Sequence, residues 1–235
     1  MMTKPKIIET DQGIQGEFNV TIYDHMQRRL RDKGRIETGE LLKHGLTHGC
    51  ALEIGPGPGY LGLEWLKHTT GTTLKGLDIS PDMIAVAERN AKEYGLLSRV
   101  EYVHSSGSKI PFDDHTFEAV FTNGSLHEWT DPRSTFDELW RVLKPGGKVF
   151  ISDLRRDMLA PVRWFLWVNT RPKEIRPGLI SSINAAYTPD ELKELIKGTK
   201  LEDCTVSSNL IGVMLVGTKG EMPQEAETQR DERPA

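Results

Sequence analysis

Three glycines spaced two residues apart, with prolines between them, form the stretch of this sequence best suited to hold a nucleotide-like ligand. The apolar run 50–54 precedes them and contains one acid, Glu53, and the helix-compatible segment 60–68 follows. Glycine allows the unusual dihedrals of a tight turn and leaves no Cβ between backbone and ligand. The N–H groups of the following helix start add partial positive charge. We therefore predict a strand, a tight turn and a helix that together cradle an adenine nucleoside.

A second acid, Asp78, ends the next strand-like run, 73–78. The pair Ser80-Pro81 then predicts a helix start, with serine as N-cap and proline at the first helical position. Gly57 to Gly62 also matches the dinucleotide fingerprint G-x-G-x-x-G, and Asp78 follows at the ~20-residue distance expected of a ribose-binding acid. NAD binding is therefore one alternative. Three features count against it: the acid Glu53 inside the first strand, a terminal strand pair, and the lack of a second domain.

The rest of the chain alternates strand and helix patterns. Further strands are expected at 100–104, 117–122 and 148–153, and helices at 83–94 and 132–143, with a turn at 144–147. This alternation indicates a parallel α/β sheet. After a helix capped by Thr188, the strands 201–206 and 210–217 are joined by a link too short for a parallel crossover, so they must form an antiparallel hairpin.

The N-terminal part differs from this pattern. Residues 1–17 are polar and irregular, and 18–46 show helical periodicity divided by Gly34 and Gly39. The arginines and lysines of 28–35 are expected to form a solvated helix face.

Composition narrows the function classes. The net charge is −4 and 27% of residues are charged. Because the chain lacks the excess of basic residues typical of nucleic-acid-binding proteins, we do not expect it to bind nucleic acid. Cys50 and Cys204 lie in apolar runs and are expected to be buried thiols rather than a disulfide. The seven histidines show no metal-ligand spacing. With no signal-like N-terminus and no apolar run of membrane-spanning length, we expect a cytoplasmic protein without stable membrane insertion.

Four segments taken together resemble the class I S-adenosylmethionine-dependent methyltransferases, especially the broad small-molecule (methyltransferase type 11-like) group. They are the strand and glycine turn 53–59, the acid and helix start 78–81, the segment Ile110-Pro-Phe-Asp with Phe117, and the turn Arg141-Val-Leu-Lys-Pro-Gly-Gly147. The resemblance covers about residues 48–153. It implies a Rossmann-like, seven-stranded, mostly parallel sheet with an antiparallel C-terminal hairpin, helices on both faces and an N-terminal helical cap.

The resemblance also implies which residues bind S-adenosylmethionine. Asp78 would accept hydrogen bonds from the ribose hydroxyls, and Met83 would pack on the adenine. The family's usual aspartate for the adenine amino group is replaced by Ser106-Gly107, and its acid after Phe117 is Glu118, expected to be structural. The full set of expected cofactor-binding residues is Glu53, Gly55, Pro56, Gly57, Gly59, Asp78, Ile79, Met83, Ser106, Gly107, Asn123 and Gly124.

Candidates for chemistry follow the fourth strand, since ligands of open α/β sheets lie at the carboxyl ends of strands. His127 is a candidate general base, with a structural or cofactor-contacting role as the alternative. Glu128 is a competing base or a cation-binding group. Tyr23 is expected to point into the same cleft.

Segment 154–187 is expected to cover the substrate. Four consecutive large apolar residues, Trp164 to Trp167, are interpreted as a buried lid helix, with a homodimer interface or membrane-surface contact as alternatives. Some of the basic residues between 155 and 176 could hold an anionic acceptor, although most are expected to be solvated.

Three regions are therefore predicted: an N-terminal tail and helical cap (1–47), a methyltransferase domain (48–218) and a disordered tail (219–235). The predicted function is methyl transfer from S-adenosylmethionine to a small-molecule acceptor. One alternative is an RNA or protein methyltransferase, supported only by the basic segments. The other is a non-catalytic S-adenosylmethionine-binding protein of the same fold.

Overall fold

A single seven-stranded sheet forms the centre of the computed structural model, which describes residues 6–7 and 13–220. Its strand order is β3-β2-β1-β4-β5-β7-β6. The strands are β1 Cys50–Ile54, β2 Thr73–Asp78, β3 Val100–His104, β4 Phe117–Asn123, β5 Leu143–Leu154, β6 Thr205–Ser208 and β7 Gly212–Thr218. The first five run parallel, and β7 pairs antiparallel with both β5 and β6. The predicted fold class and the antiparallel terminal hairpin are confirmed, but its first strand begins at Thr205 instead of residue 201.

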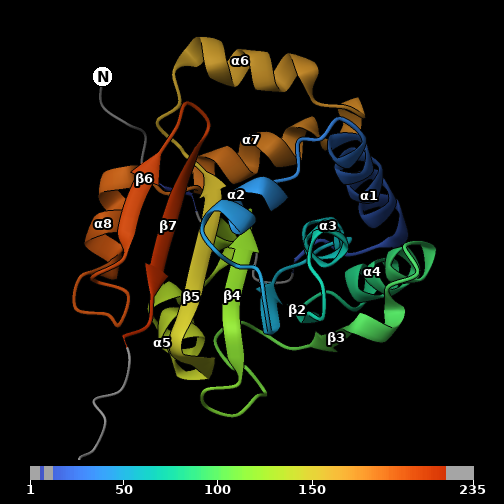
Figure 1. Cartoon of the computed structure of the whole chain (residues 1–235). Helices are drawn as coiled ribbons and strands as arrows, with labels where there is room; N and C mark the ends of the chain where they lie inside the picture. Colours follow the sequence, from blue (N-terminus) through green and yellow to red (C-terminus); the bar gives the residue numbers. More distant parts are fainter. Residues whose placement is uncertain (1–5, 8–12, 221–235) are drawn as a thin grey trace, which may run out of the picture.

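Helices cover both faces of this sheet (Figure 1). They are α1 Glu17–Asp32, α2 Thr38–Lys43, α3 Tyr60–His68, α4 Pro81–Glu93, α5 Pro132–Val142, α6 Ala160–Asn169, α7 Arg176–Ala185 and α8 Pro189–Ile196, with short 3-10 turns η1 Leu97–Arg99, η2 Leu126–Glu128 and η3 Lys173–Ile175. As expected from the sequence, Ser80 caps α4 and Thr188 caps α8 in a reciprocal capping box with Glu191.

The alternation of side chains along each strand divides the core into two layers. Leu52 and Ile54 of β1 pack on one face with side chains from α5 and α8. Ala51 lies on the other face, with α2, α3 and α4. Since successive strand residues point to opposite faces, the direction of every β1 side chain is fixed by this packing.

The order in which strands are added to the sheet reverses between β1 and β4. From β1 it proceeds outward through β2 to β3, then returns to β4 on the other side of β1. At such a switch point the loops after the two neighbouring strands diverge, one to each side, and leave a crevice at their carboxyl ends. The loops after β1, β2 and β4 meet there.

Helix α1 is fastened to α3 and α4 by one buried carboxylate. Asp24, only 4% exposed, accepts hydrogen bonds from the Tyr60 hydroxyl (2.9 Å), Arg89 Nη2 (2.8 Å) and Asn90 Nδ2 (3.1 Å). Asn90 also donates to the Pro58 carbonyl in the glycine turn, at 2.9 Å. The N-terminal cap is thereby tied to the turn by polar contacts as well as by apolar packing.

Segment 144–147 differs from the predicted turn. Leu143 already pairs with Phe117, and pairing resumes at Ala119 with Lys148, so the segment is an irregularity inside β5. The glycines of this segment also bond to the residue after β7, with Gly146 N donating to the Lys219 carbonyl at 2.8 Å.

The C-terminal boundary also differs. Lys219, where the disordered tail was expected to begin, is buried and its ammonium donates to the Leu143 carbonyl at 2.8 Å. Residues 221–235 lie outside the described part of the chain. Cys50 and Cys204 are free thiols, as expected, but both are half-buried.

The interpretation of residues 164–167 as a buried lid helix is wrong. Helix α6 has no buried residue, and Trp164, Phe165 and Trp167 are 65%, 55% and 40% exposed. The reason is its position: α6 lies beyond the end of the sheet, with α7 between it and the sheet (Figure 1).

We expect Asp24→Ala to lower the free energy of unfolding by about 2–4 kcal/mol, because Tyr60 and Asn90 lose the acceptor for buried donors and Arg89 loses its ion pair. Urea unfolding followed by circular dichroism measures this loss. Asp32→Ala removes an exposed carboxylate from the same helix and should change the value by less than about 0.5 kcal/mol. Equal effects of the two substitutions would contradict the fastening role of Asp24.

Candidate active site

The turn after β1 contains three glycines at positions where a side chain would be strained. Gly55, Gly57 and Gly59 have φ values of 63°, 53° and 83°, in the left-handed region. A Cβ on Gly55 would also lie 2.8 Å from the Cβ of Ser125 in the loop after β4. The turn therefore approaches the neighbouring loop more closely than any side chain allows. Gly59 ends the turn as the N-cap of α3.

Asp78 fixes this turn to the end of β2. Its Oδ2 accepts from the Gly57 N–H at 3.1 Å, and its Oδ1 accepts from the Ser80 N–H at 2.9 Å. Burial raises the pKa of Asp78, and these backbone donors oppose part of that rise. A carboxylate has about four acceptor sites, so the side chain can also accept hydrogen bonds from a ligand.

Glu53 points away from Asp78's cavity. The alternation of β1 places it on the face covered by α3, where it is 2% exposed and takes a backbone hydrogen bond from Gly62. Its Oε2 has no hydrogen-bond partner among the described residues. Burial, followed by the nearby charge of Asp78, raises its pKa from the ordinary 4.5 to about 8. The structure thus places Glu53 beneath the glycine turn.

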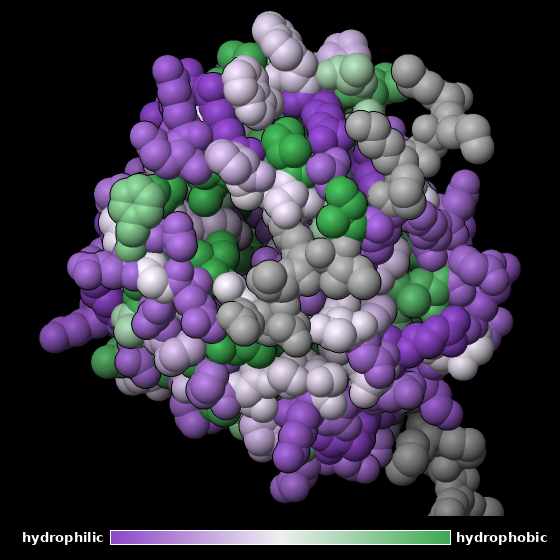
Figure 2. Space-filling model, turned by 180° about the vertical axis from the view of Figure 1, so that it is seen from behind, coloured by the Kyte–Doolittle hydropathy of each residue, from purple (hydrophilic) through white to green (hydrophobic). Residues whose placement is uncertain are grey.

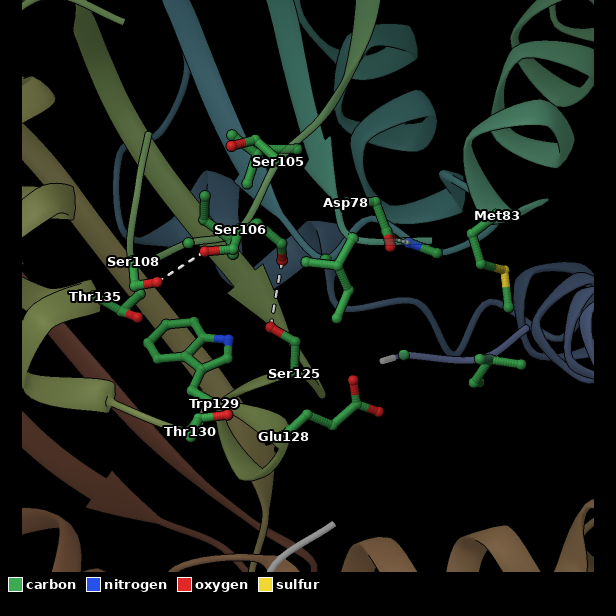
Figure 3. A pocket seen from close by; sticks show the side chains of 18 of the residues that line it. Asp78, Met83, Ser105, Ser106, Ser108, Ser125, Glu128, Trp129, Thr130 and Thr135 are labelled. Carbon is green, nitrogen blue, oxygen red and sulfur yellow. Dashed lines mark hydrogen bonds between the residues drawn. The ribbon is translucent and has the colours of Figure 1, made fainter. Parts of the chain in front are cut away.

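An inner cavity of about 430 Å³ lies where the loops after β1, β2, β3 and β4 meet. Figure 3 shows Asp78 and Met83 on one side of it and Ser106, Ser108 and Trp129 on the other. Eight of the expected cofactor-binding residues line it: Gly55, Gly57, Asp78, Ile79, Met83, Ser106, Gly107 and Gly124. These residues come from distant parts of the sequence, and the adjacent parallel strands bring them together at one edge of the sheet.

The remaining four expected residues lie elsewhere. Glu53 and Pro56 line a third cavity of about 830 Å³, which shares Tyr23, Gly55, Gly57 and Gly124 with the inner cavity. Gly59 lines none of the three cavities. Asn123 also lies outside the inner cavity, because its Nδ2 donates to Glu37 Oε2 (2.9 Å) and to Ser152 Oγ (2.8 Å). Ser152 Oγ in turn donates to Glu37 Oε2 at 2.6 Å, so the three side chains are bonded to one another.

A segment ahead of α1 closes the inner cavity and was missed from the sequence. Ser80 Oγ donates to the Ile14 carbonyl at 2.6 Å, and Gly16 N donates to Asp82 Oδ2 at 2.9 Å. Gly13 and Ile14 line both the inner cavity and a second, outer one. Residues 13–16 have no periodic pattern, so only the Gly-Ile-Gln-Gly composition could have suggested a close backbone approach.

The outer cavity, of about 580 Å³, lies between α1, α6 and α7. Much of its lining is apolar: Ile14, Met26, Leu30, Leu154, Phe165, Leu166, Ile175 and Leu179. Tyr23 and Glu128 line it and also line the inner cavity, so the two cavities meet at these side chains. Two of the three expected catalytic residues therefore lie at the junction.

His127 is held by a carboxylate at the end of β5. Its Nδ1 lies 2.9 Å from Asp153 Oδ1, and its backbone N–H donates to Asp153 Oδ2 at 2.7 Å. The ring is buried, and His127 lines the outer cavity but not the inner one. Its Nε2 lies 3.9 Å from Glu128 Oε1. Asp153 thus fixes the ring orientation next to Glu128.

Tyr23 is the least suited of the three to accept a proton. Burial, as the main cause, raises its pKa to about 12, and the nearby carboxylates add to the rise. Its hydroxyl accepts a hydrogen bond from Gln27 Nε2 at 3.0 Å. A phenol with this pKa stays protonated at neutral pH.

The prediction of a solvated basic face on α1 is only partly right. Arg28 and Arg31 turn toward α3 and α4, where Arg28 pairs with Glu93 at 3.1 Å and Arg31 stacks on Tyr60 with its centre 4.9 Å from the ring. The exposed residues of the cluster, Arg29, Lys33 and Arg35, line the outer cavity.

The second basic segment is also less solvated than expected. Arg155 pairs with Asp157, and the buried Arg156 pairs with Glu191 of α8. Arg171 and Arg176 donate to carbonyls at the end of α6. These side chains hold segment 154–187 together.

The comparisons with known proteins agree with this geometry. Residues 52–151 match the family model described as a methyltransferase domain. That stretch contains the glycine turn, Asp78 and the loop after β4. The chain carries a class I S-adenosylmethionine-dependent methyltransferase domain. The cofactor of this domain is S-adenosylmethionine.

The chain is also similar to named methyltransferases and to solved methyltransferase structures. The chain is 35% identical over 152 residues to a demethylmenaquinone methyltransferase of Bacillus licheniformis, covering 59% of this chain and 61% of that one. It is 30% identical over 158 residues to the chloroplastic 2-methyl-6-phytyl-1,4-hydroquinone methyltransferase 1 of Oryza sativa, covering 65% and 43%. A methyltransferase structure from Aquifex aeolicus superposes with a TM-score of 0.62 at 21% identity, covering 83% and 97%. The chain spans about half the length of the curated relatives it matches.

The described residues of the methyltransferase fit this cofactor. The glycine turn leaves room for a ligand at the backbone, Asp78 offers oxygens suited to ribose hydroxyls, and Met83 offers an apolar surface to a base. Within the described ranges, no three His, Cys, Asp or Glu side chains gather as a metal site would require. No described helix has the length and apolar character needed to cross a membrane.

We expect the pH dependence of stability to show the burial of Glu53. The unfolded chain releases this proton near the ordinary pKa of 4.5, whereas the folded protein keeps it until about pH 8. The folded state therefore binds the extra proton between these values, and the free energy of unfolding falls as the pH rises through that window. In the Glu53→Gln variant, the free energy of unfolding should fall over this pH range by at least about 1 kcal/mol less than in the native protein.

Thermal and urea unfolding at pH 5 and pH 8 measure the effect. Glu88→Gln, on the exposed side of α4, is the matched control and should leave the fall unchanged. If Glu53→Gln and native protein lose the same stability over this range, Glu53 is ionised in the folded state and the argument fails.

Proposed function

We propose that the protein transfers a methyl group from S-adenosylmethionine to a small, largely apolar acceptor with an ionisable hydroxyl. One observation carries this proposal: Glu128 and Tyr23 line both the inner and the outer cavity. A nucleoside in the inner cavity and an acceptor in the outer cavity would therefore meet beside a carboxylate. Holding two reactants together in this way is the main contribution an enzyme can make to a displacement reaction.

The inner cavity is assigned to the cofactor. Asp78 would accept the ribose hydroxyls, Met83 and Ile79 would contact the adenine, and Ser106 with the backbone near Gly107 would bond to its polar edge. Glu53 would act indirectly, by supporting the glycine turn from below. When bound, the cofactor supplies a methyl group on a positively charged sulfur, already activated for displacement.

The outer cavity is assigned to the acceptor. Its lining is apolar along α6 and α7, which favours a carbon-rich molecule. Relatives that match this chain are named for demethylmenaquinone and for a phytyl hydroquinone. We therefore propose a hydroquinone-type acceptor, whose hydroxyl loses its proton as the methyl group is transferred.

Glu128 is proposed as the group that takes this proton. It lies at the junction, and its Oε1 is 3.9 Å from His127 Nε2. His127, held by Asp153, is then a positioning residue that keeps the carboxylate in place. Tyr23 would donate a hydrogen bond from its protonated hydroxyl rather than accept a proton.

Two measurements test the proposal as a whole. Titration calorimetry should show binding of S-adenosylmethionine, and incubation with demethylated quinols should release S-adenosylhomocysteine. A panel containing transfer RNA and protein substrates tests the alternative acceptors. Cofactor binding without turnover on any acceptor would favour a non-catalytic role for the same fold. Binding of NAD in place of S-adenosylmethionine would contradict the assignment of the inner cavity.

Asp78→Asn is expected to weaken cofactor binding by at least about tenfold, because hydrogen bonds to a charged acceptor are worth about 1.5–3 kcal/mol each. The dissociation constant from calorimetry gives the effect. The control Asp137→Asn alters an exposed carboxylate of α5 that lines none of the three cavities, and it should leave the dissociation constant unchanged. An unchanged dissociation constant for Asp78→Asn would exclude Asp78 from the cofactor site.

Glu128→Gln is expected to lower kcat by about 10²-fold or more, as loss of a general base does, while cofactor affinity changes little. His127→Ala should lower kcat less, because it removes only the positioning contact. Single-turnover rates across a range of pH separate the two roles. If Glu128→Gln keeps full turnover and His127→Ala does not, the roles of the two residues are reversed.

A further inference from the structure

Helix α6 exposes an apolar surface that no described part of the fold covers. Leu159, just ahead of the helix, is 65% exposed, as is Trp164, and Trp167 is 40% exposed. Neither tryptophan lines any of the three cavities, so binding of a substrate would not explain their exposure. Elsewhere, on the face opposite to that in Figure 1, hydrophobic side chains lie in small separate groups among hydrophilic ones (Figure 2).

The turn between β6 and β7 extends this surface. Leu210 and Ile211 at its tip are 68% and 39% exposed. The turn reaches toward α6 (Figure 1), and Arg155 ties the two regions together by bonds to the carbonyls of Ile211 (3.0 Å) and Asn209 (2.9 Å). We call the six exposed side chains the apolar rim: Leu159, Trp164, Phe165, Trp167, Leu210 and Ile211.

Three side chains of the apolar rim line cavities. Phe165 lines the outer cavity and, with Leu210 and Ile211, the third cavity. A surface that contacts the rim would therefore also contact the wall of the outer cavity at Phe165, which is 55% exposed.

Basic side chains lie beside the apolar rim. Segment 154–187 contains six Lys and Arg residues and two Asp and Glu residues, a net charge of +4. One of the six, Arg156, is buried and paired with Glu191 of α8, so the other five carry the exposed positive charge of the segment. Arg29, Lys33 and Arg35 at the end of α1 line the outer cavity together with Arg171. Arg176 lies over Trp167, with its guanidinium carbon 4.4 Å from the ring centre.

This charge distribution decides between two partners. A symmetric dimer through the rim would bring each copy's cations against the same cations of the other, because a two-fold interface is self-complementary. A bilayer with anionic headgroups offers the opposite charge, and its interface accommodates Trp rings and the stems of Arg and Lys. An amphipathic helix with aromatic residues and flanking cations binds such an interface without spanning it.

We propose that the apolar rim docks the protein on the surface of an anionic lipid bilayer, with α6 lying in the interface. The wall of the outer cavity at Phe165 then faces the membrane. An acceptor that resides in the bilayer could enter the cavity without crossing water. This last consequence rests on the proposed function, whereas the docking itself rests only on the exposed rim and its charge.

Co-sedimentation with vesicles tests the docking. We expect the native protein to bind vesicles of phosphatidylcholine mixed with phosphatidylglycerol, and to bind pure phosphatidylcholine vesicles at least about tenfold more weakly, because several cations contribute at about 1 kcal/mol each near an anionic surface. Added salt should weaken binding to the mixed vesicles. Equal binding to both vesicles, or none to the mixed ones, would overturn the proposal.

Trp164→Ser combined with Trp167→Ser should reduce binding to the mixed vesicles by at least about tenfold, since two large apolar surfaces leave the interface. The matched control Leu97→Ser removes a 49% exposed apolar residue beside β3, at the sheet edge opposite to β6, and should bind like the native protein. Circular dichroism checks that both variants are folded. A double variant that binds as tightly as the native protein would overturn the role of the rim.

Two further measurements separate docking from the alternatives. Light scattering after size exclusion reports the oligomeric state, and a native dimer that the tryptophan double variant dissociates would show that the rim binds a second copy instead. Calorimetry with S-adenosylmethionine should give the same affinity for native protein and double variant. Loss of vesicle binding with intact cofactor binding supports docking even if the proposed acceptor is wrong.

Discussion

The hydrogen bond between the Asp78 carboxylate and the Gly57 N–H is the contact on which the site depends. It joins the end of β2 to the turn after β1, and both ends meet there only because the strands are parallel and adjacent in the sheet. Burial of this carboxylate disfavours its charge, and the backbone donors of Gly57 and Ser80 offset part of that cost. The same donors hold the turn open at the floor of the inner cavity. These contacts thus join the end of β2 to the glycine turn that lines the proposed cofactor site.

Much of this central region could be predicted because its determinants are local in the sequence. The strand 73–78 and the helix start at Ser80 have the bounds expected from their residues, and the capping of α8 by Thr188 depends on a residue three positions away. The antiparallel hairpin followed from the length of one link. In each case the controlling interaction spans only a few residues, so the order of residue types is sufficient to specify it.

The errors concern features set by distant packing. A run of large apolar residues at 164–167 predicts burial only if another element covers it, and here α7 separates α6 from the sheet. The direction of the Glu53 side chain is also set by packing, because the alternation of β1 turns it toward α3, and its part in cofactor binding stays a prediction. The basic cluster on α1 divides between Tyr60 and the outer cavity, a division that depends on how α1 is rotated. No local pattern contains this information.

The segment ahead of α1 has a consequence for how the two cavities respond to ligands. Gly13 and Ile14 form part of the wall of both cavities, and hydrogen bonds to Ser80 and Asp82 hold this wall against α4. A ligand that orders or displaces the shared wall from one side changes the free energy of binding on the other. Linkage requires this effect to be reciprocal, so each ligand alters the affinity of the other by the same factor. One short segment at residues 13–16 would thus couple ligand binding in the proposed cofactor site to ligand binding in the proposed acceptor site.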